Sequence, residues 1–285
     1  MSSRLWMILI LAIALTGCDS TDVAPADELL VVEAFLFAGE SVDDIKLSRV
    51  ISLNSDETVP AAVNDAVVTL SKGATIYSLV STGTDGIYTY PGSDLVVEAG
   101  DVFELVIETD GAIIRAETQV PIAPAGTTIS VSEVVVPELE IGAGPGQGPR
   151  QNPGALREFF QSEENAISVT WDNDVGDAYF VAIRTPEAEN PDFILPEFIR
   201  DRFGGIEIIT QPTTANFFDI RLFSLEVIGE YTATVYRINQ EYVDLYLNRE
   251  QDSRDLNEPP TNIVGGLGVF SAFSRQEVRF ELVRE

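Results

Sequence analysis

Short runs of β-branched and aromatic residues separated by turn dipeptides recur along the chain from Leu29 onward, and helical periodicity is almost absent. The clearest hairpin has Asp110-Gly111 at its turn, a dipeptide that accepts positive φ and twists as the flanking strands do. The pattern predicts about seven strands in the first half: Leu30–Phe37, Ile45–Ile51, Ala66–Leu70, Thr75–Ser81, Ile87–Tyr90, Val102–Thr109 and Ala112–Val120. This spacing predicts a β-sandwich domain over residues 28–123.

A second β-rich region follows and contains one helical segment. Its expected strands are Thr128–Glu140, Ile167–Trp171, Ala178–Arg184, Phe217–Val227, Tyr231–Tyr236 and Gln276–Arg284. The second and third of these resemble strands of fibronectin type III modules, in which an inward tryptophan fills the space between the sheets. Asn239 can cap a short helix, and its apolar stripe is expected to pack on the sheet rather than bind a partner: Ile238, Tyr242, Leu245 and Tyr246.

We therefore predict an all-β protein of two β-sandwich domains, of immunoglobulin, fibronectin III or transthyretin type, with one short helix in the second. The second domain is expected over residues 124–285. It contains a glycine- and proline-rich loop at residues 141–154, which lacks the lysine of a phosphate-binding loop. It also contains an insertion, Thr185–Gly204, whose apolar residues predict either a short capping helix or an exposed patch.

The N-terminus carries a bacterial lipoprotein signal. Arg4 precedes the apolar run Leu5–Leu15, and small residues lead to Cys18. The run is too short to span a membrane, since a spanning helix needs about 20 residues, and the alternative is an ordinary secretory signal with an incidental cysteine. We predict a signal peptide at residues 1–17, lipid attachment at Cys18 and a tether at residues 18–27.

Composition excludes several classes of function. The chain has 17 Lys and Arg residues against 46 Asp and Glu, a formal charge of −29, so nucleic acid is not expected as a partner. It has no histidine, which removes Ser-His-Asp and Cys-His catalysis and every His-ligated metal site. With one cysteine, no intrachain disulfide can form. We therefore expect a protein that is not an enzyme, without a cofactor.

Two segments are ambiguous between a structural and a functional interpretation. Asp172, Asp174 and Asp177 could wrap a calcium ion, but their spacing departs from the EF-hand pattern, and a turn between strands is the favoured interpretation. In the glycine-rich run 265–273, Leu267, Phe270 and Phe273 could anchor a partner. The alternative is a bulged strand whose phenylalanines enter the core.

Several motifs together resemble one lipoprotein family, called domain of unknown function forty-two forty-nine. They are the opening Leu29–Ala34, the stretch Ala66–Ser71 leading to Asp85–Tyr88, the hairpin Glu98–Thr109 with its exit Thr118–Pro121, the Trp171 turn, and Asn262–Phe273. The resemblance covers nearly the whole mature chain and brings no catalytic residues. It implies a location in the cell envelope beside a TonB-dependent outer-membrane receptor.

The leading hypothesis is a non-catalytic lipoprotein of the cell envelope that binds such a receptor and is held at the membrane by lipid on Cys18. We expect the outer membrane rather than the inner, although Asp19 leaves the sorting open. The alternatives are a surface glycan hydrolase acting through paired carboxylates, and a structural or adhesion lipoprotein.

Overall fold

The computed structural model describes residues 29–51, 58–137, 159–160, 162, 166–185, 192–194, 207–248 and 260–285. Cys18, the tether, the loop at 141–154 and most of the 185–204 insertion lie outside these ranges. Within them, no helix is long and apolar enough to cross a membrane.

The N-terminal lobe contains the strands predicted before residue 124. They are β1 (Leu30–Phe37), β2 (Ile45–Arg49), β3 (Val67–Lys72), β4 (Thr75–Ser81), β5 (Ile87–Thr89), β6 (Val102–Thr109) and β7 (Ala112–Gln119). Side chains alternate between core and solvent along β1, as a half-buried strand requires. Asp110 and Gly111 adopt φ values of 49° and 80°, so the β6–β7 hairpin has the predicted turn.

The C-terminal lobe contains the remaining elements. They are β8 (Thr128–Ile129), β9 (Glu133–Val136), β10 (Ile167–Thr170), β11 (Ala178–Arg184), β12 (Glu207–Ile209), β13 (Phe217–Ile220), the 3-10 turn η4 (Leu222–Ser224), β14 (Gly229–Ile238), helix α4 (Gln240–Asn248) and β15 (Leu267–Arg284). The all-β prediction with a helix after Asn239 is confirmed. The single strand expected over Thr128–Glu140 is two short strands, because β8 pairs with β10 while β9 pairs with β15.

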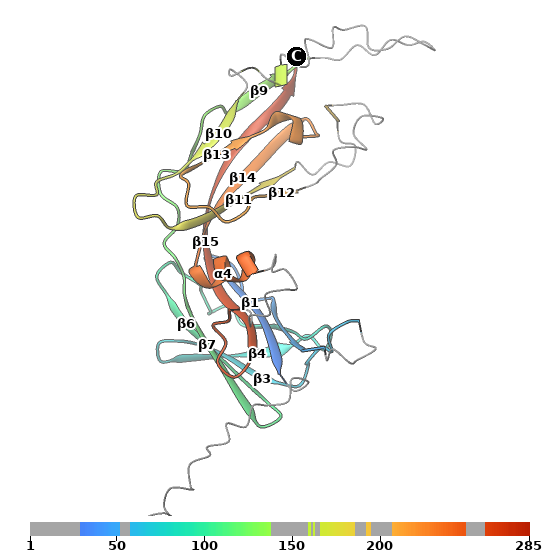
Figure 1. Cartoon of the computed structure of the whole chain (residues 1–285), viewed down its shortest axis with the longest axis vertical. Helices are drawn as coiled ribbons and strands as arrows, with labels where there is room; N and C mark the ends of the chain where they lie inside the picture. Colours follow the sequence, from blue (N-terminus) through green and yellow to red (C-terminus); the bar gives the residue numbers. More distant parts are fainter. Residues whose placement is uncertain are drawn as a thin grey trace, which may run out of the picture.

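Strand β15 belongs to both lobes (Figure 1). The observed division of the chain between the lobes therefore differs from the predicted domain boundary. Its first part, from Leu267 to Phe273, pairs in parallel with β1. Its second part pairs with β14, from Phe273 to Leu282. The prediction assigned all of β15 to the second domain, but pairing with β1 places its start in the first.

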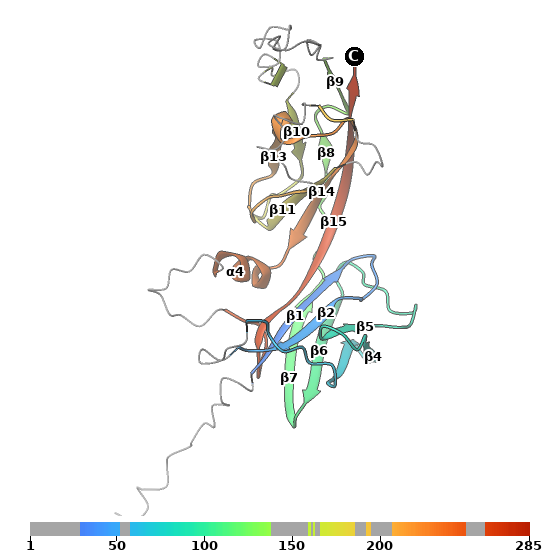
Figure 2. The same cartoon turned by 90° about the vertical axis from the view of Figure 1, so that its right-hand side faces the viewer.

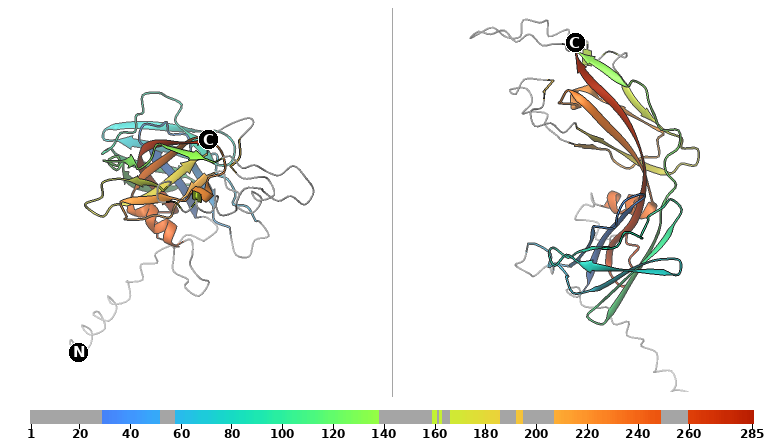
Figure 3. Two further views of the ribbon diagram at one scale, coloured as in Figure 1. Left: turned by 90° about the horizontal axis from the view of Figure 1, so that it is seen from above. Right: turned by 180° about the vertical axis from the view of Figure 1, so that it is seen from behind.

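The sheet order reflects this shared strand. One sheet runs β12-β11-β14-β15-β1-β2-β5-β4-β3-β6-β7, with β9 also beside β15, and a second sheet runs β13-β10-β8. The 18 residues of β15 reach about 55–60 Å at the usual rise of roughly 3.3 Å per residue. Figures 2 and 3 show β15 continuing without a break from one lobe to the other.

Each lobe has its own hydrophobic core. The N-terminal core includes Leu36, Leu70, Phe103 and Phe270. The C-terminal core includes Trp171, Tyr179, Tyr231 and Phe280. Trp171 is 2% exposed and packs on the Tyr179 ring at 5.5 Å, so the predicted inward tryptophan is confirmed. The two cores are thus separate, and β15 supplies a buried phenylalanine to each.

Glycine at position 268 permits the pairing of β15 with β1. Gly268 has φ +105°, and a Cβ there would lie 2.0 Å from the backbone oxygen of Val32. No other residue type fits that approach without moving one strand. The glycine therefore allows the backbones of β1 and β15 to approach closely.

Candidate functional site

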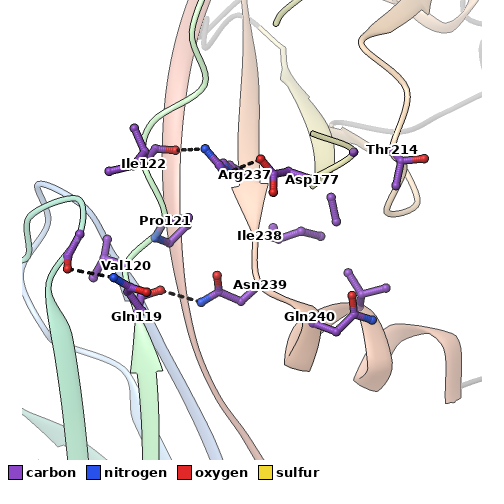
Figure 4. A pocket seen from close by; sticks show the side chains of 14 residues that line it. Gln119, Val120, Pro121, Ile122, Asp177, Thr214, Arg237, Ile238, Asn239 and Gln240 are labelled. Atoms are coloured by element: carbon purple, nitrogen blue, oxygen red, sulfur yellow. Dashed lines mark hydrogen bonds and ion pairs between the residues drawn. The ribbon is translucent and has the colours of Figure 1, made fainter. Parts of the chain in front are cut away.

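A cavity of about 440 Å³ lies where the two lobes meet (Figure 4). The N-terminal lobe supplies Gly100 and the end of β7 with the residues after it, Gln119–Ile122. The C-terminal lobe supplies Gly176–Ala178, Thr214, Arg237–Gln240 and Val243. A molecule in this cavity would therefore touch both lobes at once.

The turn Asp172–Asp177 forms part of the wall and is held by an asparagine. Asn173 Nδ2 donates to the backbone oxygens of Asp177 and Thr214, at 3.0 and 2.8 Å. Asn173 Oδ1 accepts from the Asp177 backbone N–H at 2.9 Å, and Gly176 has φ +75°. The favoured interpretation of this cluster as a turn is confirmed. Its role is to place Asp177 at the cavity.

Asp177 and Arg237 form an ion pair in the cavity wall, with side chains 30% and 25% exposed. Arg237 Nη1 also donates across the junction to the backbone oxygen of Ile122 at 3.5 Å. These are the only two charged residues among the fourteen that line the cavity. The charges cancel locally, in a chain whose formal charge is −29.

Polar contacts at the start of α4 connect the lobes. Asn239 Nδ2 donates to the backbone oxygen of Gln119 at 2.8 Å and to Thr118 Oγ1 at 3.1 Å. Thr118, which is 4% exposed, donates in turn to Glu241 Oε1 at 2.8 Å. Asn239 stands just before the helix, as predicted. Its side-chain N–H groups bind the other lobe, and its backbone oxygen accepts from the N–H groups of Tyr242 and Val243 at 3.2 and 3.3 Å.

An aromatic cluster also spans the junction. The ring of Phe273 stacks on Phe37 at 5.0 Å and meets Tyr242 of α4 edge-on at 5.0 Å. Tyr242 also contacts the rings of Phe35 and Phe180, each at 6.0 Å. The apolar side of α4 is therefore packed on the sheet, as predicted.

The predicted partner-binding residues are part of this packing. Phe270 is 0% exposed in the N-terminal core and Phe273 is 3% exposed under α4. Leu267 is half-buried at the start of β15. The interpretation as partner anchors was wrong for the two phenylalanines, because parallel pairing with β1 turns them into the fold. The alternative, a strand that buries them, is the observed arrangement.

A charged contact beside the aromatic cluster reinforces the junction. Arg275 of β15 forms an ion pair with Glu40 of the N-terminal lobe and a second with Glu277 at 3.5 Å. Partial burial works to lower the pKa of Arg275, but Glu40, Tyr236 and Glu277 outweigh it, and the pKa is raised. Arg275 therefore stays protonated near neutral pH and well above it.

Sequence reasoning did not find the cavity. Gln119 is more than 100 residues from Arg237 and Asn239 in the chain, and it meets them only because β7 and β14 end at the same junction. The Asp-Asn-Asp turn was the one available signal, and its chemistry was considered as a calcium loop. The ion-pair partner of Asp177 is Arg237, which lies on β14, and the sequence of that strand gave no sign of a functional role.

The C-terminal lobe also has an exposed aromatic edge. Phe217 of β13 and Phe223 of η4 are 51% and 49% exposed, and the Arg221 guanidinium lies over the Phe223 ring at 5.9 Å. Within the described residues, β13 is one of the two edge strands of the three-stranded sheet, and β8 is the other. We call Phe217, Arg221 and Phe223 the β13 edge patch.

The fold defines an all-β protein of sandwich-like lobes joined by a shared strand. The chain belongs to the family described as Domain of unknown function (DUF4249), which matches residues 19–279. No curated protein matches it significantly. Among solved structures, the chain is similar to one titled a cytokine receptor complex, with 11% identity, a TM-score of 0.25, and coverage of 88% of this chain and 95% of that one. It is also similar to a set of titin domains, with 12% identity, a TM-score of 0.21, and coverage of 90% and 67%.

Proposed function

We propose that this protein is a non-catalytic, lipid-anchored lipoprotein of the cell envelope that binds an outer-membrane receptor of the TonB-dependent type. The lipid attachment site is Cys18, at the end of the signal peptide. The observation that supports a binding role is the junction between the lobes, where one continuous strand, the ion pair of Arg275 with Glu40 and an aromatic cluster join them. A partner then meets both lobes in one preset orientation, which lowers the ordering cost of association.

The direction of β15 supports an orientation relative to the anchor. β1 runs parallel to the start of β15, so Leu29 and Leu30 lie at the end of the N-terminal lobe that faces away from the other lobe. The tether joins the chain there. In the proposed arrangement the N-terminal lobe stands next to the membrane, and the C-terminal lobe projects away from it along β15.

The β13 edge patch is the contact surface that we propose on the projecting lobe. Phenylalanine and arginine together are typical of residues that dominate binding energy at interfaces. An outermost strand also offers unpaired backbone groups to a strand of a partner. We propose this patch as the contact surface instead of Phe270 and Phe273, because both of those phenylalanines are buried.

The experiment is crosslinking and co-purification from intact cells. Wild type is compared with Phe217→Ala plus Phe223→Ala, and with the control pair Ile76→Ala plus Val80→Ala, which are 69% and 47% exposed on the N-terminal lobe. We expect a receptor-type outer-membrane protein with wild type and the control, and at least tenfold less with the β13 variant. Equal recovery with the β13 variant would place the contact elsewhere.

The anchor is tested separately. Cys18→Ser should abolish acyl labelling and release the protein from membranes, because no other cysteine is present. Unchanged labelling would refute the lipoprotein assignment whatever the partner is.

The junction cavity does not support the glycan-hydrolase alternative. That chemistry needs two carboxyl groups facing each other roughly 5–10 Å apart. The lining of the junction cavity has one carboxylate, Asp177, and Arg237 is paired with it.

A further inference from the structure

The junction cavity has the size and position of a small-molecule site. Its volume of about 440 Å³ falls within the usual range of about 300–1,000 Å³, and such sites favour the interface between two folded units. We propose that this cavity binds a small neutral molecule rich in hydroxyl groups, namely a short saccharide. This inference goes beyond the proposed partner contact and does not depend on it.

The ion pair in the cavity lining argues against a charged ligand. Asp177 and Arg237 are the charged lining residues, and each is the partner of the other. An anionic ligand would have to take Arg237 from Asp177, and a cationic ligand would have to take Asp177 from Arg237. Either exchange leaves a partly buried charge without its partner, which is costly. A neutral ligand leaves the pair intact.

The amide side chains of the lining offer oxygen acceptors. Gln119 Nε2 donates to the backbone oxygen of Gly100 at 3.3 Å, and Gln240 Nε2 donates to Asp244 Oδ1 at 2.7 Å. The side-chain N–H groups of Asn239 donate to Thr118 and Gln119 of the other lobe. The side-chain oxygens of Gln119, Asn239 and Gln240 accept no hydrogen bond from the part of the chain that the structure describes. Three amide oxygens are therefore available to donors of a ligand.

Hydroxyl groups are the neutral donors that match this lining. Amines also donate, but they are cationic near neutral pH and meet the charge argument above. A saccharide hydroxyl donates and accepts at the same atom, so it can bond an amide oxygen and also the exposed Thr214 hydroxyl. A peptide chain has one N–H for each C=O, and it supplies fewer donors to a lining rich in acceptors.

The lining also has an apolar wall, which lies opposite Thr214 and Gln240. Pro121 and Ile122 line the cavity, and Ile122 is 59% exposed. Apolar surface with a few placed polar groups is the usual composition of a small-molecule site. The C–H face of a sugar ring can pack on this wall while its hydroxyls point to the amides. Figure 4 shows Pro121 and Ile122 on one side and Thr214 and Gln240 on the other.

The test measures saturation-transfer NMR on the full-length protein in lauryldimethylamine oxide micelles, which contain no sugar. The probes are cellobiose, maltose, lactose and diacetylchitobiose, with trigalacturonate and triglycine as charged and peptide comparisons. The variant Gln119→Leu plus Gln240→Leu removes two acceptors at exposed positions, and Thr214→Trp fills the cavity from its rim. Gln276→Leu is the matched control, because it makes the same change at an exposed position of β15 outside the cavity.

We expect at least one neutral disaccharide to bind wild type and the Gln276→Leu control alike. Its affinity should fall at least tenfold in the double leucine variant and be lost in Thr214→Trp, with unchanged melting temperatures showing that the variants fold. Three results would overturn the proposal: no transfer to any neutral disaccharide, equal affinity in the cavity variants, or binding of trigalacturonate or triglycine alone. The saccharide assay uses the isolated protein, so none of these three results bears on the proposed receptor contact. Failure to recover a receptor from cells would likewise not affect the saccharide result.

Discussion

The two lobes are expected to unfold as one cooperative unit, because β15 supplies a buried phenylalanine to each core. Phe270 is 0% exposed in the N-terminal core, and Phe280 is 1% exposed in the C-terminal core, where it stacks on Tyr231 at 5.2 Å. Truncating either side chain removes buried surface and leaves a cavity. Phe→Ala changes of this kind cost about 3–5 kcal/mol.

The expected shift in melting temperature follows from that cost. For a unit of about 150–250 residues, each kcal/mol lowers Tm by about 2–4 °C, so Phe270→Ala and Phe280→Ala should each lower it by about 6–20 °C. The assay is differential scanning calorimetry, and each variant should show a single transition. Phe223→Ala is the control, because the same change at a side chain 49% exposed should cost far less.

Two separate transitions, with Phe270→Ala shifting one and Phe280→Ala shifting the other, would refute the reasoning. That result would mean that the ion pair, the aromatic cluster and β15 do not couple the lobes. Each lobe would then be an independent folding unit despite the shared strand.

Three further predictions concern backbone geometry, pH and salt. Gly268→Ala should destabilise the protein by more than about 1 kcal/mol, because its Cβ would meet the Val32 oxygen at 2.0 Å; Gly73→Ala, also at positive φ but with open space around its Cβ, is the control, and equal melting temperatures for the two would contradict the close approach. Burial raises the pKa of Tyr231 to about 12, so the unfolded chain loses this proton first; the stabilisation is complete below about pH 10 and declines by about 1.4 kcal/mol per pH unit as pH rises toward 12. Urea unfolding at pH 9–12 should show that the free energy of unfolding declines with pH less steeply in Tyr231→Phe than in wild type, by about 1.4 kcal/mol per pH unit. An equal decline in the two proteins would show that Tyr231 does not cause it. Stability should rise with sodium chloride up to about 1 M, where the screening length is about 3 Å, because the chain carries a formal charge of −29; a Tm independent of salt would mean that the ion pairs already compensate that repulsion.

Much of the local structure was predictable because it depends on neighbours in the sequence. The alternation along β1 and β11 defined those strands to the residue, and Asp110-Gly111 defined the turn of a hairpin. These signals are local, since side-chain alternation and positive φ belong to a few consecutive residues. The inward Trp171 was implied by the resemblance of its strand to one of fibronectin type III modules.

The run 265–273 shows where local signals stopped being sufficient. Glycines beside phenylalanines indicate a close backbone approach and large apolar side chains. This pattern is the same whether the side chains pack in the core or against a partner. The choice between a partner and the core depended on the strand that pairs with β15. That strand is β1, more than 200 residues earlier in the chain.

The sequence by itself determined the all-β class, the turns, most strands and the formal charge of −29. The tertiary structure decided that one strand serves both cores, that Phe270 and Phe273 are internal, and that Arg237 neutralises Asp177 in a cavity between the lobes. The physical reason is the range of the interactions. Strand and turn preferences act over a few residues, whereas sheet pairing and ion pairs join residues whose distance along the chain places no limit on their contact.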